Sequence, residues 1–204
     1  PSRGLGDVYK RQTYKLAGHM LMDKRKHLFW SPCAAHCIDL ILEDIGKKKN
    51  VKEMVERAKE VTTFIYNHNQ VVAIMRKFTK GRELLRPAAT RFATNFIALE
   101  SLFQHRGELS EMFASREWLN TKHGNKTSGT PVDVANTIRD NKYWKKVNAI
   151  LKVMEPLMRV LRLVETDEAP TMGFLYDAMD KAKLAIQRDC RSWETYWKMI
   201  DRRW

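Results

Sequence analysis

Residues 141–165 read NKYWKKVNAILKVMEPLMRVLRLVE, and apolar side chains recur there every three or four positions. This spacing places them on one face of a long helix, and that face must pack against another apolar surface. The stripe consists of Val147, Ile150, Leu151, Met154, Leu157, Met158, Leu161 and Leu163. Pro156 lies inside the stretch and predicts a kink, because proline removes one helical hydrogen bond. A helix of this kind indicates a bundle built around it.

The sequence on both sides of this stretch predicts further helices, joined by short polar segments. They cover residues 51–67, 70–79, 94–115, 132–139, 171–188 and 192–204. We expect the 94–115 stretch to be a pair of helices that breaks near Gly107, and Asn50 to cap the helix that begins at residue 51. The connecting segments are residues 80–92, KGRELLRPAATRF, and residues 120–131, NTKHGNKTSGTP. The sequence therefore predicts an all-α domain of about six to eight helices over residues 49–204.

Residues 13–48 follow a different pattern, which predicts a helix, a strand and a helix. Residues 14–25 have the spacing of a helix, and residues 27–31, HLFWS, have that of a short buried strand. The apolar side chains Leu16, Met20 and Leu21 lie on one face of this first helix. Residues 34–48 predict a helix that is apolar around most of its circumference. Because a lone strand cannot satisfy its backbone groups, we expect residues 13–48 to end an α/β core that begins upstream.

Residues 1–12, PSRGLGDVYKRQ, resemble non-native sequence placed before a reading frame. We therefore expect a leader over residues 1–12, the end of an α/β core over 13–48 and a helical domain over 49–204. This organisation predicts that the fold class is mainly α.

The composition limits the classes of function. The chain has 204 residues and a net charge of +13, which favours a polyanionic partner, either nucleic acid or an anionic membrane surface. An inert basic surface is the alternative. No apolar run approaches the roughly 18 residues of a membrane span, and no secretory signal is present. No basic amphipathic helix has the strong Trp/Leu face expected at a lipid interface, so we expect no membrane partner. The three cysteines, Cys33, Cys37 and Cys190, are an odd number, which favours free thiols in a reducing compartment.

The densest basic segment runs from Arg76 to Arg91, with six basic side chains, one acidic one and a local charge of +5. Its basic residues are Arg76, Lys77, Lys80, Arg82, Arg86 and Arg91. Phe78 and Phe92 are interleaved with these cations. Cations attract phosphates and an exposed aromatic ring can stack on an unpaired base, so the pattern is compatible with DNA binding. The alternative is that both rings belong to the core and the cations are solvated.

A second motif, Cys33 to Cys37, has a cysteine and a histidine three residues apart at the start of a predicted helix. Cys33 and His36 could be half of a zinc site, but no second pair with finger-like spacing follows. A cysteine–histidine nucleophile and a purely structural role are the other interpretations. The carboxylates Asp39, Glu43 and Asp44 share one helix, and no carboxylate on a neighbouring strand joins them, so we assign no catalytic acid and no metal ligand.

Three segments together resemble plant transposases of the hAT superfamily and their domesticated relatives. They are residues 14–42, YKLAGHMLMDKRKHLFWSPCAAHCIDLIL, residues 85–99, LRPAATRFATNFIAL, and residues 196–204, YWKMIDRRW. The resemblance implies an RNase H-like core with an Asp, Asp, Glu triad that binds Mg or Mn, interrupted by an all-helical insertion. The positions of the three acids fall outside residues 13–204, and Asp7 lies in an unrelated context. The resemblance thus implies that the chain has no cofactor of its own and no complete active site.

The resemblance also implies roles for particular residues. Cys33 and His36 match the family's Cys-x-x-His motif, which is implicated in handling transposon-end DNA. Thr90, Arg91 and Phe92 resemble its Thr-Arg-Trp motif, in which the aromatic ring stacks near a flipped base. Phe92 replaces the tryptophan and offers a smaller ring without an N–H donor.

The sequence therefore predicts a DNA-binding fragment of an hAT-type transposase or of a transposase-derived nuclear protein, itself catalytically inactive. The alternative is a domesticated, non-catalytic scaffold or regulatory interaction protein. Any homo-oligomer would form through segments that this chain does not contain.

Overall fold

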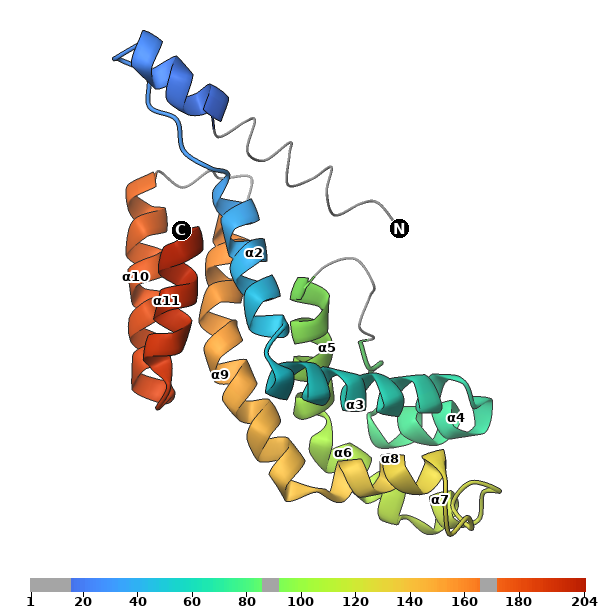
Figure 1. Ribbon diagram of the computed structural model, residues 1–204. Coiled ribbons are helices and arrows are strands. Elements are labelled where there is room, and N and C mark those ends of the chain that lie inside the picture. Colours follow the sequence, from blue (N-terminus) through green and yellow to red (C-terminus); the bar gives the residue numbers. More distant parts are fainter. Residues whose placement is uncertain (1–15, 86–91, 166–171) are drawn as a thin grey trace.

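The computed structural model describes residues 16–85, 92–165 and 172–204, and the described chain is mainly helical, as the sequence predicts (Figure 1). The labelled helices are α2 (Ala34–Gly46), α3 (Lys49–Tyr66), α4 (Asn69–Phe78), α5 (Phe92–Gln104), α6 (Arg106–Ala114), α7 (Arg116–Leu119), α8 (Thr130–Arg139), α9 (Asn141–Val164), α10 (Met172–Asp189) and α11 (Trp193–Arg203). A further helix covers residues 16–24. From residue 49 onward the described chain has nine helices, because the four-residue α7 joins those that the sequence predicts. The expected leader, residues 1–12, lies outside the described residues.

Helix α9 is the centre of the fold. It packs against α10, α2, α5 and α3, and it continues through Pro156 as one helix of 24 residues. Every member of the predicted apolar stripe is buried except Leu163, which is half-buried. Burying one large aliphatic side chain stabilises a fold by about 1.5–3 kcal/mol, so this stripe is a main source of the stability of the bundle.

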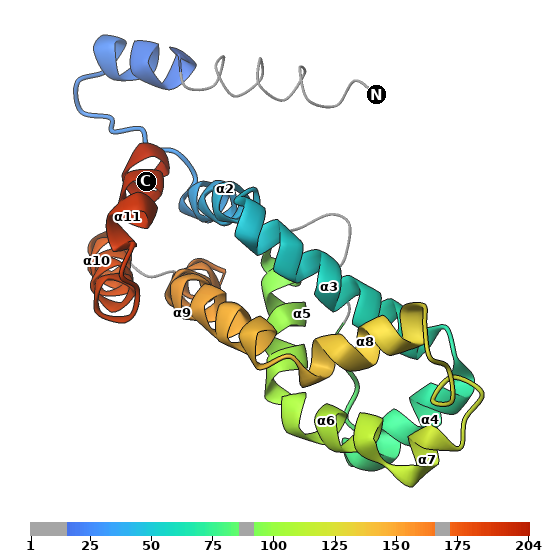
Figure 2. The ribbon, with the colours of Figure 1, turned by 60° about the horizontal axis from the view of Figure 1, so that its bottom comes forward.

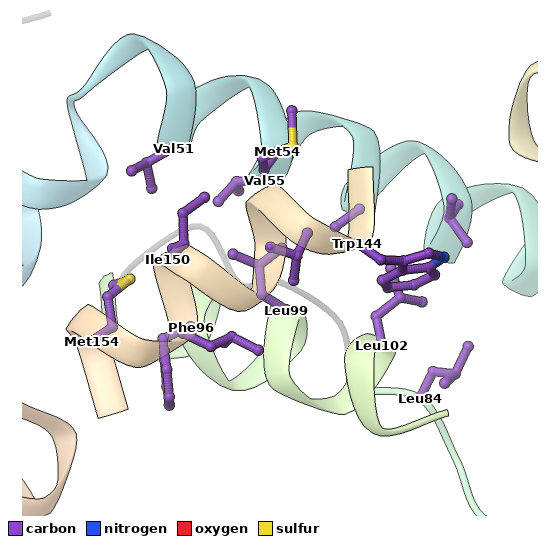
Figure 3. Packing of buried hydrophobic residues seen from close by; sticks show 14 of the residues in the cluster. Val51, Met54, Val55, Leu84, Phe96, Leu99, Leu102, Trp144, Ile150 and Met154 are labelled. Atoms are coloured by element: carbon purple, nitrogen blue, oxygen red, sulfur yellow. The ribbon is translucent and has the colours of Figure 1, made fainter. Parts of the chain in front are cut away.

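The core between α3, α5 and α9 is visible in Figure 3. Val51 and Val55 of α3 lie on one side, Phe96 and Leu99 of α5 lie on the other, and Ile150 of α9 lies between them. These side chains are all less than 9% exposed. Three helices that are far apart in sequence are thereby joined into one hydrophobic cluster.

One predicted helix cap is wrong, and one predicted break lies two residues from its expected place. Helix α3 starts at Lys49 with Lys48 as its N-cap, so Asn50 lies in the first turn and caps nothing. The break between α5 and α6 falls at His105 and not at Gly107. The predicted pair of helices is present, and Gly107 lies in the first turn of the second helix because glycine tolerates helical backbone.

The predicted strand over residues 27–31 is also wrong. The described residues contain no strand, and residues 28–33 form irregular chain after a turn. The physical reason is that no neighbouring strand in the described part of the chain accepts or donates the ladder hydrogen bonds. Trp30 instead covers Gly18, where any β-carbon would collide with its ring. Helix 16–24 projects from the bundle in Figures 1 and 2, and its predicted apolar face is exposed, with Met20 63% accessible.

Candidate nucleic-acid interface

The first part of the predicted basic segment is the end of α4 and the turn that follows it. Arg76 and Lys77 lie in the last turn of α4, where the helix dipole favours cations. Lys80 and Gly81 then take left-handed backbone, with φ of 54° and 79°, and the N–H of Gly81 donates to the carbonyl of Arg76 at 2.7 Å. This geometry ends the helix and leaves Lys80 exposed.

Most of these cations have carboxylate partners. The Arg76 Nε donates to Glu83 Oε1 at 2.6 Å, and the Arg82 Nη2 donates to Glu108 Oε1 at 3.1 Å. Lys77 pairs with Glu117. Lys80 forms no ion pair with any described residue. The local charge of +5 already counts Glu83, and the fold adds two acids that are remote in sequence, Glu108 and Glu117, as partners of Arg82 and Lys77.

Hydrogen bonds fix the linker after α4. The Thr79 hydroxyl donates to the carbonyl of Arg82 at 2.7 Å, and the backbone N–H of Leu84 donates to the Tyr66 hydroxyl oxygen at 2.9 Å. A hydrogen bond from its own backbone N–H holds the pKa of Glu108 below the ordinary value, and His105 and Arg82 act in the same direction. Glu108 thus stays ionised and available to Arg82.

The remaining residues of this predicted set divide into two groups. Phe78 is half-buried and packs against the hydrophobic cluster, as the core interpretation of that ring predicts. Arg86, Thr90 and Arg91 lie outside the described residues. The backbone of Phe92 begins α5.

Cys33 and His36 lie at the start of α2. Cys33 is exposed and holds the N-cap position without a side-chain hydrogen bond, and His36 is half-buried in the first turn. The thiol that enters the core is Cys37, which is 6% exposed. Burial raises the pKa of the Cys37 thiol, and the nearby Cys33 acts in the same direction. All three cysteines of the chain are free thiols.

The structure does not bring the two predicted groups together. The start of α2 lies at one end of the bundle and α4 lies at the other (Figures 1 and 2). Helix α3, which lies between them in the chain, is about 27 Å long at 1.5 Å per residue. Any single DNA surface that used both groups would have to run along the length of the bundle.

The described residues include no cluster of three or more histidine, cysteine, aspartate or glutamate side chains that could hold a metal ion. They therefore do not fit the Mg or Mn site of the family that the sequence resembles, and no catalytic step is assigned to them. Asp44 has a different partner: it accepts hydrogen bonds from Arg203 Nε at 2.9 Å and Arg202 Nη2 at 2.8 Å. This carboxylate joins α2 to α11, a contact across more than 150 residues that no local pattern announces.

The structure gathers a second set of cations that the sequence did not single out. Lys122 and Lys126 belong to the predicted loop over residues 120–131, and Arg139 ends α8. None of the three forms an ion pair with a residue that the structure describes. Figures 1 and 2 place this loop at the same end of the bundle as α4. A Lys-His-x-x-Lys pattern in a turn-rich loop was the available signal for two of them.

Comparison with protein families agrees with part of the resemblance. Residues 9–61 match the model described as a domain of unknown function (DUF659), a domain found in proteins related to hAT-like transposases. The match includes Cys33 and His36. No curated protein and no solved structure matches the chain. In the described part of the chain, no helix is both long and apolar enough to cross a membrane.

Proposed function

We propose that this chain binds DNA as part of an hAT-type transposase or of a transposase-derived nuclear protein. The observation that carries the proposal is the DUF659 match over residues 9–61, which falls on the segment with the most specific resemblance to that family. The net charge of +13 supports a polyanionic partner. The parent reaction would be metal-dependent DNA cleavage and strand transfer, and none of its steps is attributed to a residue described here.

The end of the bundle formed by α4 and residues 79–85 suits contact with a phosphate backbone. Lys80 is exposed and has no carboxylate partner in the described chain. The pairs of Arg76 and Arg82 are solvent-exposed, and such pairs contribute only about 0–1 kcal/mol. Phosphates could therefore replace Glu83 and Glu108 as partners at little cost to the fold.

The pairing itself favours a second candidate function, a domesticated scaffold without DNA chemistry. Arg76, Lys77 and Arg82 each have a carboxylate partner in the free chain. Cations used in this way connect helices, because Lys77 joins α4 to α7 and Arg82 joins the linker to α6. The two candidates differ in whether nucleic acid competes for these side chains.

The first experiment is binding of the 204-residue chain to duplex and hairpin DNA over a range of salt concentrations, with Arg91→Ala and Phe92→Ala. If the proposal is right, affinity falls steeply with salt and Arg91→Ala lowers the salt slope by about one. Phe92→Ala should remove any preference for the hairpin. Weak binding that both substitutions leave unchanged would contradict DNA binding and favour the scaffold.

A charge-matched pair of substitutions tests the role of the ion pairs. Glu108→Gln releases Arg82, whereas Glu60→Gln removes the same charge from an exposed position on α3. We expect tighter DNA binding for Glu108→Gln than for Glu60→Gln. Equal effects of the two would mean that DNA responds only to net charge and that Arg82 is not part of the interface.

A further inference from the structure

A small cavity lies between the loop over residues 120–129 and helix α8. Its volume is about 120 Å³, and its lining includes His123, Lys126, Asn136 and Arg139. A tetrahedral oxyanion with part of its hydration shell is of this size, whereas a drug-sized ligand needs about 300 Å³ or more. The polar side chains in the lining offer hydrogen-bond donors and none is a carboxylate, while Trp118, Leu119, Pro131, Val132 and Ala135 form its apolar part.

One buried side chain in this lining has a polar atom without a hydrogen-bond partner. His123 is 7% exposed, and its Nδ1 has no hydrogen-bond partner in the structure. A buried polar atom without a partner costs about 1–3 kcal/mol, so a ligand that forms a hydrogen bond with this Nδ1 would recover that loss. The ring is also held in place, because it meets His68 at 4.2 Å and Phe64 at 5.6 Å between ring centroids.

The loop is built so that it keeps this arrangement. The Thr121 hydroxyl oxygen accepts the backbone N–H groups of His123 at 3.3 Å and of Gly124 at 3.0 Å, and its own O–H donates to the carbonyl of Trp118 at 2.8 Å. A side chain at Gly124 would collide with the backbone of Trp118. His123 and Lys126 are therefore presented to the cavity by a fixed turn.

The two permanently charged side chains that line the cavity are both cations. Lys126 and Arg139 line it, Lys122 lies on the same loop, and none of them has an ion-pair partner among the described residues. The Arg139 Nη2 donates to the carbonyl of Phe113 at 2.7 Å, which fixes the guanidinium and leaves other N–H groups available. Cations without ion-pair partners that line a small cavity attract an anion.

We propose that this cavity is a binding site for a phosphate-type oxyanion, held by Lys126, Arg139 and His123. The anion can be free phosphate or the phosphodiester of a nucleic acid. The site does not depend on the proposed DNA function, because a free phosphate would occupy it equally. Charge-assisted hydrogen bonds to Lys126 and Arg139 supply the affinity, and the His123 ring supplies a further donor once it is protonated.

The test is to titrate the 204-residue chain with inorganic phosphate and with sulfate. Binding is measured by calorimetry and by the NMR signals of the His123 ring. We expect one saturable site and a shift of the His123 signals. Lys126→Gln should weaken binding about tenfold, as expected for the loss of one charge-assisted hydrogen bond. Lys122→Gln is the matched control, because it removes the same charge from the same loop outside the cavity lining, and it should change affinity by less than about threefold.

A DNA arm identifies the source of the anion. If a short duplex displaces bound sulfate, the site takes a phosphodiester, and if sulfate stays bound while DNA binds elsewhere or not at all, it takes free phosphate. Either result retains the oxyanion site. Absence of saturable binding, or equal losses for Lys126→Gln and Lys122→Gln in chains that melt like the original, would overturn it.

Discussion

Two basic regions lie at the same end of the bundle, and they differ in what surrounds their charges. At the end of α4, Arg76 and Arg82 pair with Glu83 and Glu108. In the loop over residues 120–129, Lys122 and Lys126 have no ion-pair partner among the described residues. The denser cluster in the sequence is thus the more neutralised one in space. Charge density along a chain therefore does not locate positive potential, because the fold can bring a carboxylate such as Glu108 to a cation that is 26 residues away.

The two regions are also held by different contacts. Residues 79–85 are anchored in the core by Leu84, which is 3% exposed, while their cations form exposed ion pairs that add about 0–1 kcal/mol each. The loop over residues 120–129 rests on aromatic rings: Trp118 meets Phe113 edge-on at 4.7 Å and Phe64 at 6.1 Å. Both regions therefore rest on the core, the loop through the ring of Trp118 and residues 79–85 through Leu84.

Trp118→Ala should destabilise the fold more than any other substitution discussed below. Trp118 is 3% exposed, and removing a buried aromatic ring of this size costs about 3–5 kcal/mol of unfolding free energy. Chemical denaturation followed by circular dichroism measures the loss. Leu119→Ala is the control, because Leu119 is adjacent on α7 and 44% exposed, and we expect less than about 1 kcal/mol. Similar costs for the two would mean that the loop does not rest on the aromatic rings.

An intermediate effect is expected for Gly124→Ala. A β-carbon at this position would collide with the carbonyl of Trp118, and relieving such a clash costs about 1–3 kcal/mol. Gly107→Ala on α6 is the matched control with the opposite sign. Nothing lies near the position of its β-carbon, so alanine should leave stability unchanged or raise it by about 0.5–1 kcal/mol. Thermal unfolding of both variants distinguishes a close contact from a general intolerance of alanine.

The helical architecture could be predicted from the sequence because periodicity reports burial directly. The stripe from Val147 to Leu161 is buried as predicted, and the helices lie close to their expected ranges. The strand predicted over residues 27–31 is absent because a run of five residues is too short for its periodicity to distinguish a strand from irregular chain. Only neighbouring strands decide whether such a run forms ladder hydrogen bonds. Asn50 misled because its side chain suits a cap, while the backbone had already turned at Lys48.

The candidate sites were less predictable, because their partners are remote in sequence. Nothing near Arg82 indicates that Glu108 will accept its hydrogen bond, 26 residues later. The same holds for Arg139, which reaches the cavity beside His123 only after α8 has turned the chain back. A sequence pattern can name candidate cations, but only the fold shows which of them keep their charge unpaired.

The smallest expected effect is a pH dependence confined to the loop. Burial lowers the pKa of His123, and His68, Lys122 and Lys126 act in the same direction, so the folded loop favours the neutral ring. The neutral ring therefore contributes fully to the stability of the folded loop above the ordinary histidine pKa of about 6.5. This stability is lost as the pH falls from there toward the lower pKa of the folded state. Hydrogen exchange, corrected for intrinsic rates, should show weaker protection of residues 120–129 at pH 5.5 than at pH 7.5, with residues 150–158 of α9 unchanged. His123→Gln should remove the difference, and sulfate should oppose it in the original chain if the cavity binds oxyanions. Equal losses in α9 and in the loop would show that acid acts on the whole bundle and that His123 is not its cause.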